Sequence, residues 1–201
     1  MSTHLNTGAK FAVIGSMVVL AAWSTAPVFK FQPESRLWIE GTSTVRSFSC
    51  RAGQLEGNAE TVPAAAQPAI AGLDTLIRGV KATIPVAALD CGNGTMNDHM
   101  RKALKADKHS AIEYRLTSYE VIGGEGETAR VRMEGRLAMA GQEKPITMEA
   151  TAVLNRNGAL QVRGSKQIVM SEWGVKPPSL MLGMMKVRDP VLVHFDVVLS
   201  P

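Results

Sequence analysis

Apolar and polar side chains alternate with a period of two residues along most of this chain, most clearly over residues 128–140. There Val131, Met133 and Leu137 occupy alternate positions, and charged residues such as Arg130 lie between them. A strand that buries one face requires this period, because its successive side chains point to opposite sides. The pattern recurs as far as the end of the chain, so it predicts a mainly β fold.

The alternating segments are joined mostly by short turns, among which the Asn157-Gly158 step is a strong hairpin signal. Residues 58–72 are rich in alanine and proline and lack a period, so we expect a connecting loop there. A long antiparallel sheet tends to curl and close, because closure removes its exposed edges. We therefore expect an eight-stranded antiparallel, lipocalin-like β-barrel. The expected strands cover 35–44, 45–57, 75–84, 111–122, 128–140, 145–154, 159–170 and 191–199.

One segment, residues 95–107, has helical spacing instead. Met96, His99 and Met100 fall on one face of it, and Thr95 with Asp98 resembles a capping box at its start. We expect one short amphipathic helix packed against the barrel.

The N-terminal 26 residues differ in kind from the rest. Lys10 precedes an apolar run over 11–23, which small residues follow. This order is typical of a secretory signal peptide, and the run is shorter than the ~20 residues of a membrane-spanning helix. We expect residues 1–26 to be a signal peptide, with an uncleaved N-terminal anchor as the alternative. Residues 33–201 then form the barrel domain, in the periplasm or outside the cell.

Two cysteines, Cys50 and Cys91, lie in the expected barrel domain. An even number of cysteines in an oxidising compartment favours a disulfide over two buried thiols. A bridge that closes a loop of this length stabilises a protein by roughly 3–4 kcal/mol in the chain-entropy picture.

Small residues and methionines dominate the expected inner face of the barrel, as at Gly41, Gly135, Ala150 and Met148. Small residues leave room and methionine adapts its shape, which favours an elongated apolar cavity over a filled core. Arg78 and Lys176 are candidates for contact with a polar headgroup, although a bulge near Gly79 or a rim position is the preferred interpretation for Arg78. The candidate ligand-binding residues are Tyr114, Leu116, Val131, Met133, Leu137, Met139, Ile146, Met148, Leu160, Val162, Val193 and Phe195, with Leu180, Met181 and Met184 covering the mouth.

Four segments, taken in order, resemble the YceI-like family of bacterial envelope proteins. They are SRLWIEGTSTVRSF, NDHMRKAL, IEYRLTSYEV and the closing run with VKPP and GMMKVRDPV, and the similarity extends over roughly 33–199. The resemblance implies a lipocalin-like barrel with a helix that holds a polyisoprenoid or related lipid. This chain departs from the usual family pattern in the insertion at 58–72, in its cysteine pair and in its few aromatic residues.

Chemistry-bearing motifs are missing from the sequence. None of the histidines stands at metal-ligand spacing, no cofactor motif occurs, and no nucleophile elbow is present. The net charge of +4 is too small and too dispersed to indicate nucleic-acid binding. Together with the expected apolar cavity, the resemblance implies a non-catalytic periplasmic carrier for a long-chain hydrophobic ligand, namely a polyisoprenoid, an isoprenoid quinone or a fatty-acyl lipid. A structural or interaction module of the envelope with a filled barrel is the alternative. Membrane contact for ligand exchange and assembly as a homodimer both stay open.

Overall fold

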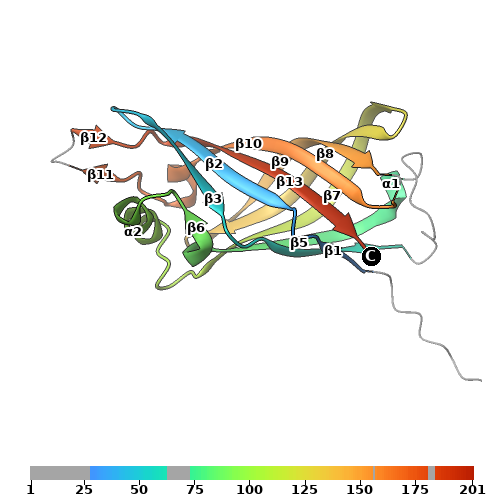
Figure 1. The fold of residues 1–201 in the computed structure, drawn as a ribbon, viewed down its shortest axis with the longest axis horizontal. Coiled ribbons are helices and arrows are strands. Elements are labelled where there is room, and N and C mark those ends of the chain that lie inside the picture. The colour runs from blue at the N-terminus through green and yellow to red at the C-terminus, as the bar shows by residue number, and fades with distance from the viewer. Residues whose placement is uncertain (1–27, 63–72, 156, 181–183) are drawn as a thin grey trace, which may run out of the picture.

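The computed structural model describes residues 28–62, 73–155, 157–180 and 184–201, which form a long β-barrel with a helix at one end (Figure 1). The expected signal peptide lies outside these residues. No helix in the described part of the chain is long and apolar enough to cross a membrane. The elements are β1 Val28–Phe31, β2 Arg36–Thr42, β3 Ser47–Ala52, β4 Glu56–Thr61, α1 Leu73–Leu76, β5 Ile77–Pro85, a 3-10 turn Val86–Ala88, β6 Leu89–Asp90, α2 Gly94–Ala103, β7 Ala111–Glu125, β8 Thr128–Met139, β9 Gln142–Leu154, β10 Leu160–Val169, a 3-10 turn Met170–Trp173, β11 Ser179–Leu180, β12 Met185–Lys186 and β13 Pro190–Ser200.

The barrel closes as a ring of eight antiparallel strands in the order β1-β4-β5-β7-β8-β9-β10-β13, and β1 also pairs with β13. β1 and β2 are the two halves of one bent strand, and β3 and β4 are the halves of the next, since β1 pairs with β4 and β2 with β3. At the α2 end of the barrel, β13 pairs with β2, and β3 pairs with β6. The expected eight-stranded, lipocalin-like barrel with one short amphipathic helix is therefore confirmed.

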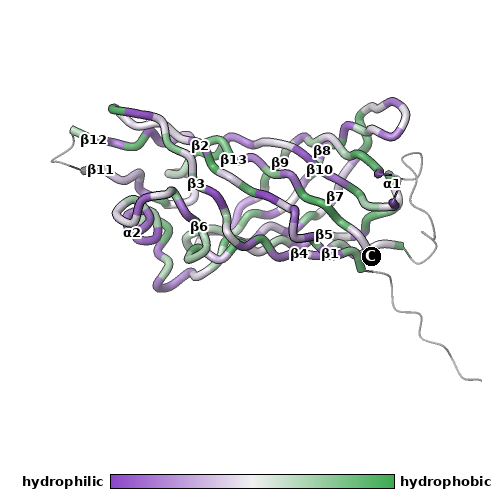
Figure 2. The backbone as a smooth tube through the Cα atoms, viewed as in Figure 1, coloured by the Kyte–Doolittle hydropathy of each residue, from purple (hydrophilic) through white to green (hydrophobic). Residues whose placement is uncertain are grey.

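Hydrophobic and hydrophilic positions alternate along the barrel strands (Figure 2). The inward residues form two buried clusters. One cluster contains Leu73, Ala129 and Leu160 and fills the end of the barrel at which α1 lies, which we call the floor. The other cluster contains Leu89 and Leu104, and side chains of α2 pack against it. The C-terminus lies toward the floor, and α2, β11 and β12 lie at the opposite end (Figure 1).

Three expectations about local structure are wrong. Residues 56–61 form strand β4, because their backbone pairs with β5, although a loop was expected to begin at residue 58. Helix α2 begins after Asn93, whose side chain accepts a hydrogen bond of 3.0 Å from the Met96 N–H, so Thr95 is not the cap. Strand β9 begins at Gln142 and not at Pro145, because the preceding turn consists of Ala140 and Gly141, both with positive φ.

The interpretation of Arg78 as part of a bulge agrees with the structure. Glu60 pairs with Gly79 and Thr61 pairs with Ile77, so Arg78 is the extra residue between two ladder positions. The bulge leaves the Arg78 side chain exposed.

Candidate ligand-binding cavity

An apolar cavity of about 400 Å³ occupies the barrel between the floor and α2. Its wall is built from the inward positions of the barrel strands and is completed by α2 and by Val175, Pro178, Met185 and Val187. The exposed lining residues are Arg46, Asn93 and Thr95, which lie in the β2–β3 turn and at the start of α2 and so mark the opening. A volume in this range is typical of sites for small organic ligands.

Most of the predicted ligand-binding residues line this cavity. The cross-strand partners explain why, since residues paired in an antiparallel ladder point to the same side: Met133 pairs with Met148, and Val193 pairs with Ile39. Whether these side chains contact a ligand stays a prediction. The predicted residues that line the cavity are Tyr114, Leu116, Met133, Leu137, Met139, Ile146, Met148, Val162, Val193 and Phe195.

Other predicted residues lie elsewhere. Val131 and Leu160 also point inward, but they are buried in the floor cluster. Met184 is 73% exposed and does not line the cavity, and Met181 lies outside the described residues. Leu180 belongs to β11. The headgroup candidates Arg78 and Lys176 are both exposed and lie outside the cavity lining.

Aromatic rings cover the inward glycines of neighbouring strands. A Cβ atom at Gly135 would come within 2.5 Å of the Tyr114 ring, and one at Gly164 would come within 2.5 Å of the Phe195 ring. The inward glycines therefore have a second role besides leaving space: they let aromatic rings pack against the wall of the barrel. Phe31 and Phe48 pack in the same way on Gly57 and Gly41. Aromatic residues thus line this cavity although the chain has few of them.

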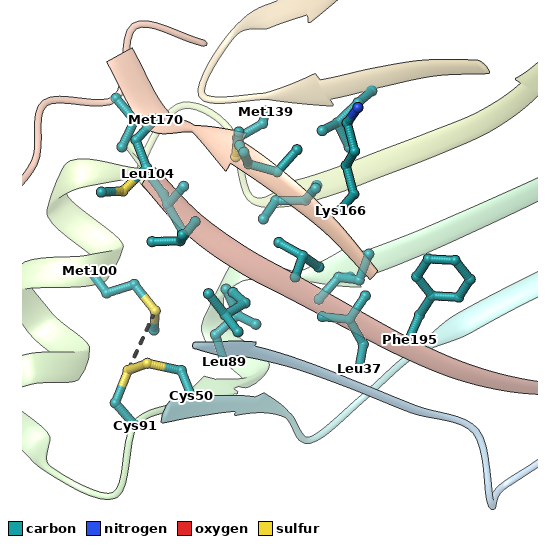
Figure 3. Close-up of a pocket in the computed structure, with 18 of the residues that line it drawn as sticks. Leu37, Cys50, Leu89, Cys91, Met100, Leu104, Met139, Lys166, Met170 and Phe195 are labelled. Atoms are coloured by element: carbon teal, nitrogen blue, oxygen red, sulfur yellow. Dashed lines mark hydrogen bonds between the residues drawn. A yellow bond between two sulfur atoms is a disulfide. The ribbon is translucent and has the colours of Figure 1, made fainter. Parts of the chain in front are cut away.

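The disulfide between Cys50 and Cys91 joins β3 to the segment that leads into α2, as expected from the sequence (Figure 3). Both cysteines line the cavity. The Met100 sulfur of α2 lies 3.7 Å from the Cys91 sulfur, a van der Waals contact because a bridged sulfur has no proton. The side chain of Asp90 accepts hydrogen bonds from the Asn97 amide and the Gly92 N–H, and these bonds lower the pKa of its carboxyl group. The bridge and these bonds hold α2 against the barrel end.

Few polar groups reach the cavity. The Tyr114 hydroxyl is buried without a hydrogen-bond partner among the described residues, and burial raises its pKa to about 12. Lys166 lines the cavity from β10, and His99 lines it from α2. The sequence reasoning did not identify Lys166, although the two-residue step from Val162 would have placed it on the inner face.

The outer face of the barrel, in contrast, has ion pairs between neighbouring strands. Arg132 pairs with Glu120 at 2.6 Å and with Glu149 at 3.1 Å, and Arg163 pairs with Asp196 at 3.1 Å. Within the described part of the chain, no group of three His, Cys, Asp or Glu residues could hold a metal ion. The polar chemistry of the barrel is therefore on the outside, and the cavity can offer a ligand mainly apolar contact.

Solved structures with the same fold are known. The YCEI protein of Campylobacter jejuni has a TM-score of 0.56 and 18% identity, with 74% of this chain and 82% of that chain covered. BcnA of Burkholderia cenocepacia has a TM-score of 0.65 and 18% identity, with coverage of 82% and 95%. A polyisoprenoid-binding domain from Saccharophagus degradans, implicated in plant cell wall breakdown, has a TM-score of 0.66 and 13% identity, with coverage of 88% and 99%.

These identities are low, so the structural likeness shows a shared fold and nothing finer. No curated protein matches the chain significantly. The model of the YceI-like domain family, however, matches residues 30–199, which is nearly all of the part that the structure describes. The chain belongs to the YceI-like domain family.

Proposed function

We propose that this protein is a non-catalytic carrier that holds a long-chain hydrophobic ligand in its barrel, in the periplasm or outside the cell. The observation that supports this proposal most is the cavity itself, whose wall is formed almost wholly by apolar side chains. The structural neighbour from Saccharophagus degradans is described as a polyisoprenoid-binding domain, which supports the same class of ligand. The open cavity disfavours the alternative of a filled barrel.

The energetics of burial favour a ligand with a long hydrocarbon chain. Each buried methylene group contributes ~0.8 kcal/mol, so about fifteen of them, ~12 kcal/mol in total, give micromolar affinity after entropy losses of about 4 kcal/mol. A polyisoprenoid, the tail of an isoprenoid quinone and a fatty-acyl chain all meet this requirement.

Displacement of the neutral fluorescent probe N-phenyl-1-naphthylamine tests the proposal. Protein that has been stripped of lipid should enhance the fluorescence of the probe, and hexadecanol should reverse that enhancement at micromolar concentration. Native mass spectrometry of protein purified from its own host should show a bound hydrophobic molecule. A protein that binds neither compound and is always recovered empty would support the interaction-module alternative.

We also propose that the open end of the barrel contacts an anionic membrane surface during ligand exchange. Two apolar side chains project there, Val45 at 65% exposure and Met184 at 73%. They lie on adjacent segments, because the Thr44 hydroxyl donates a hydrogen bond of 2.9 Å to the Met184 carbonyl. Exposed basic residues flank them and would complement anionic lipid headgroups, namely Arg46, Lys186 and Arg188.

Vesicle flotation tests this membrane contact. The wild-type protein should float with vesicles that contain phosphatidylglycerol and much less with pure phosphatidylcholine vesicles. The double variant Val45→Asp with Met184→Asp should lose flotation, because both apolar tips become charged. The matched control is Val28→Asp, since Val28 is an exposed apolar residue of β1, away from the opening. Equal flotation of both variants would contradict the proposed orientation.

A further inference from the structure

The wall of the cavity contains one lysine in an otherwise apolar row of side chains. Lys166 pairs with Val193 across β10 and β13, and Val193 pairs with Ile39 across β13 and β2. All of these residues line the cavity, and Lys166 is half-buried (Figure 3). The position is therefore fixed by strand register and does not depend on a loop.

No counter-ion balances this lysine in the part of the chain that the structure describes. The described residues that line the cavity include no aspartate or glutamate. No described carboxylate lies within ion-pair distance of Lys166, whereas the outer-face Arg163 of the same strand pairs with Asp196. An ammonium group in apolar surroundings is destabilising unless an anion or hydrogen-bond acceptors compensate for its lost hydration.

Tyr114 supplies a second polar group to the same cavity. Its hydroxyl is buried without a partner among the described residues, and its ring lies over Gly135 of the neighbouring strand β8. A buried hydroxyl without a partner has lost its hydrogen bonds to water, so a ligand oxygen that accepts a hydrogen bond from it lowers the free energy of the complex. Because the phenol stays protonated, it can donate a hydrogen bond to an acceptor oxygen of a ligand.

We propose that the ligand is an amphiphile with an anionic head group, a carboxylate or a phosphate monoester, whose oxygens bind the Lys166 ammonium and the Tyr114 hydroxyl while its chain fills the apolar cavity. This inference rests on the proposed carrier function and narrows its ligand class from hydrophobic molecules in general to acidic lipids. A neutral isoprenoid or a neutral quinone leaves the charge of Lys166 without a counter-ion.

Probe displacement with ligands matched in chain length tests the inference. Palmitate, hexadecyl phosphate and hexadecanol share a sixteen-carbon chain and differ in the head group. We expect the wild-type protein to bind at least one of the two anions about 10- to 100-fold more tightly than hexadecanol, which is the range that a charge-assisted hydrogen bond provides. The comparison of palmitate with hexadecyl phosphate identifies which acidic head group the site prefers.

Variants of the two polar residues separate the head group from the chain. Lys166→Met keeps the length of the side chain and should remove the preference for the anion, measured as the ratio of anion affinity to hexadecanol affinity within the variant. Lys166→Arg should retain the preference, because it retains the charge. Tyr114→Phe should weaken anion binding about two- to tenfold, as expected for one neutral hydrogen bond. Circular dichroism and thermal melting establish that each variant is folded.

The possible failures are distinguishable. If the wild-type protein binds hexadecanol as tightly as both anions, the acidic-lipid inference is wrong and the carrier function stands. If Lys166→Met keeps the anion preference, Lys166 is not the head-group partner and the inference is also wrong. If the wild-type protein binds none of the three lipids, the proposed carrier function itself is wrong.

Discussion

Substitution of Met148 by arginine is a direct test of the cavity as a binding site. Met148 lies midway along β9, pairs with Met133 across β8 and lines the cavity. An arginine there introduces a charged group that must stay hydrated, so it blocks the tube for a hydrocarbon chain. If the block excludes about four methylene groups, the loss is ~3 kcal/mol, or about 200-fold in the dissociation constant.

Hexadecanol is the appropriate ligand for this test, because a neutral head group does not respond to the added charge. Its affinity for Met148→Arg is measured by displacement of N-phenyl-1-naphthylamine. The matched control is Thr147→Arg, which adds the same charge one residue away on the exposed face of β9 and should leave affinity unchanged. Met148→Leu keeps the site apolar and should change affinity by no more than a few-fold. A folded Met148→Arg variant with wild-type affinity would refute the assignment of the ligand to this cavity.

Three further predictions concern stability. Replacing both Cys50 and Cys91 by alanine should lower the free energy of unfolding in urea by about 4 kcal/mol, because the bridge spans 41 residues; an unchanged midpoint would contradict this. Gly135→Ala should lower the free energy of unfolding by about 1–3 kcal/mol, because the new Cβ would meet the Tyr114 ring and the Arg115 carbonyl. In the control Gly79→Ala the new Cβ meets nothing within 4 Å, so the loss of stability should be less than about 0.5 kcal/mol. Equal losses of stability in the two variants would contradict the close packing at Gly135. Hydrogen bonds from the Ser171 hydroxyl and N–H hold the pKa of Asp189 below its ordinary value of 3.8, so its ionised form stabilises the fold above that pH and the contribution is lost on acidification. The melting temperature of the wild-type protein should therefore fall more steeply below about pH 4 than that of Asp189→Asn, and parallel curves would contradict this.

The sequence predicted the barrel well because alternation is a direct consequence of strand geometry. In β8 and β13, each of which has one dry face, the inward residues were identified correctly. Short strands such as β1 carry too few residues to show a period, so no alternating pattern marks them. Strand β4 was missed in part for a different reason: its segment is small and polar and shows no clear period, and its backbone is held as a strand by pairing with β1 on one side and β5 on the other.

Position along the barrel was harder to predict than the direction in which a side chain points. Val131 and Met133 both point inward, yet one lies in the floor cluster and the other at the cavity wall. Alternation gives no information on depth, which depends on how the strands are staggered in the closed ring. Lys166 was missed, although its place in the alternating pattern of β10, four residues after Val162, was readable.

The opposite placement of the C-terminus and the opening has a practical consequence for measurement. A biotin or affinity tag attached after Pro201 would anchor the protein by its floor end, because β13 finishes there (Figure 1). A sensor chip prepared in this way presents the opening to the flowing solution. Vesicles and lipid donors then meet the same face on each immobilised molecule, so transfer rates can be recorded from a uniformly oriented layer.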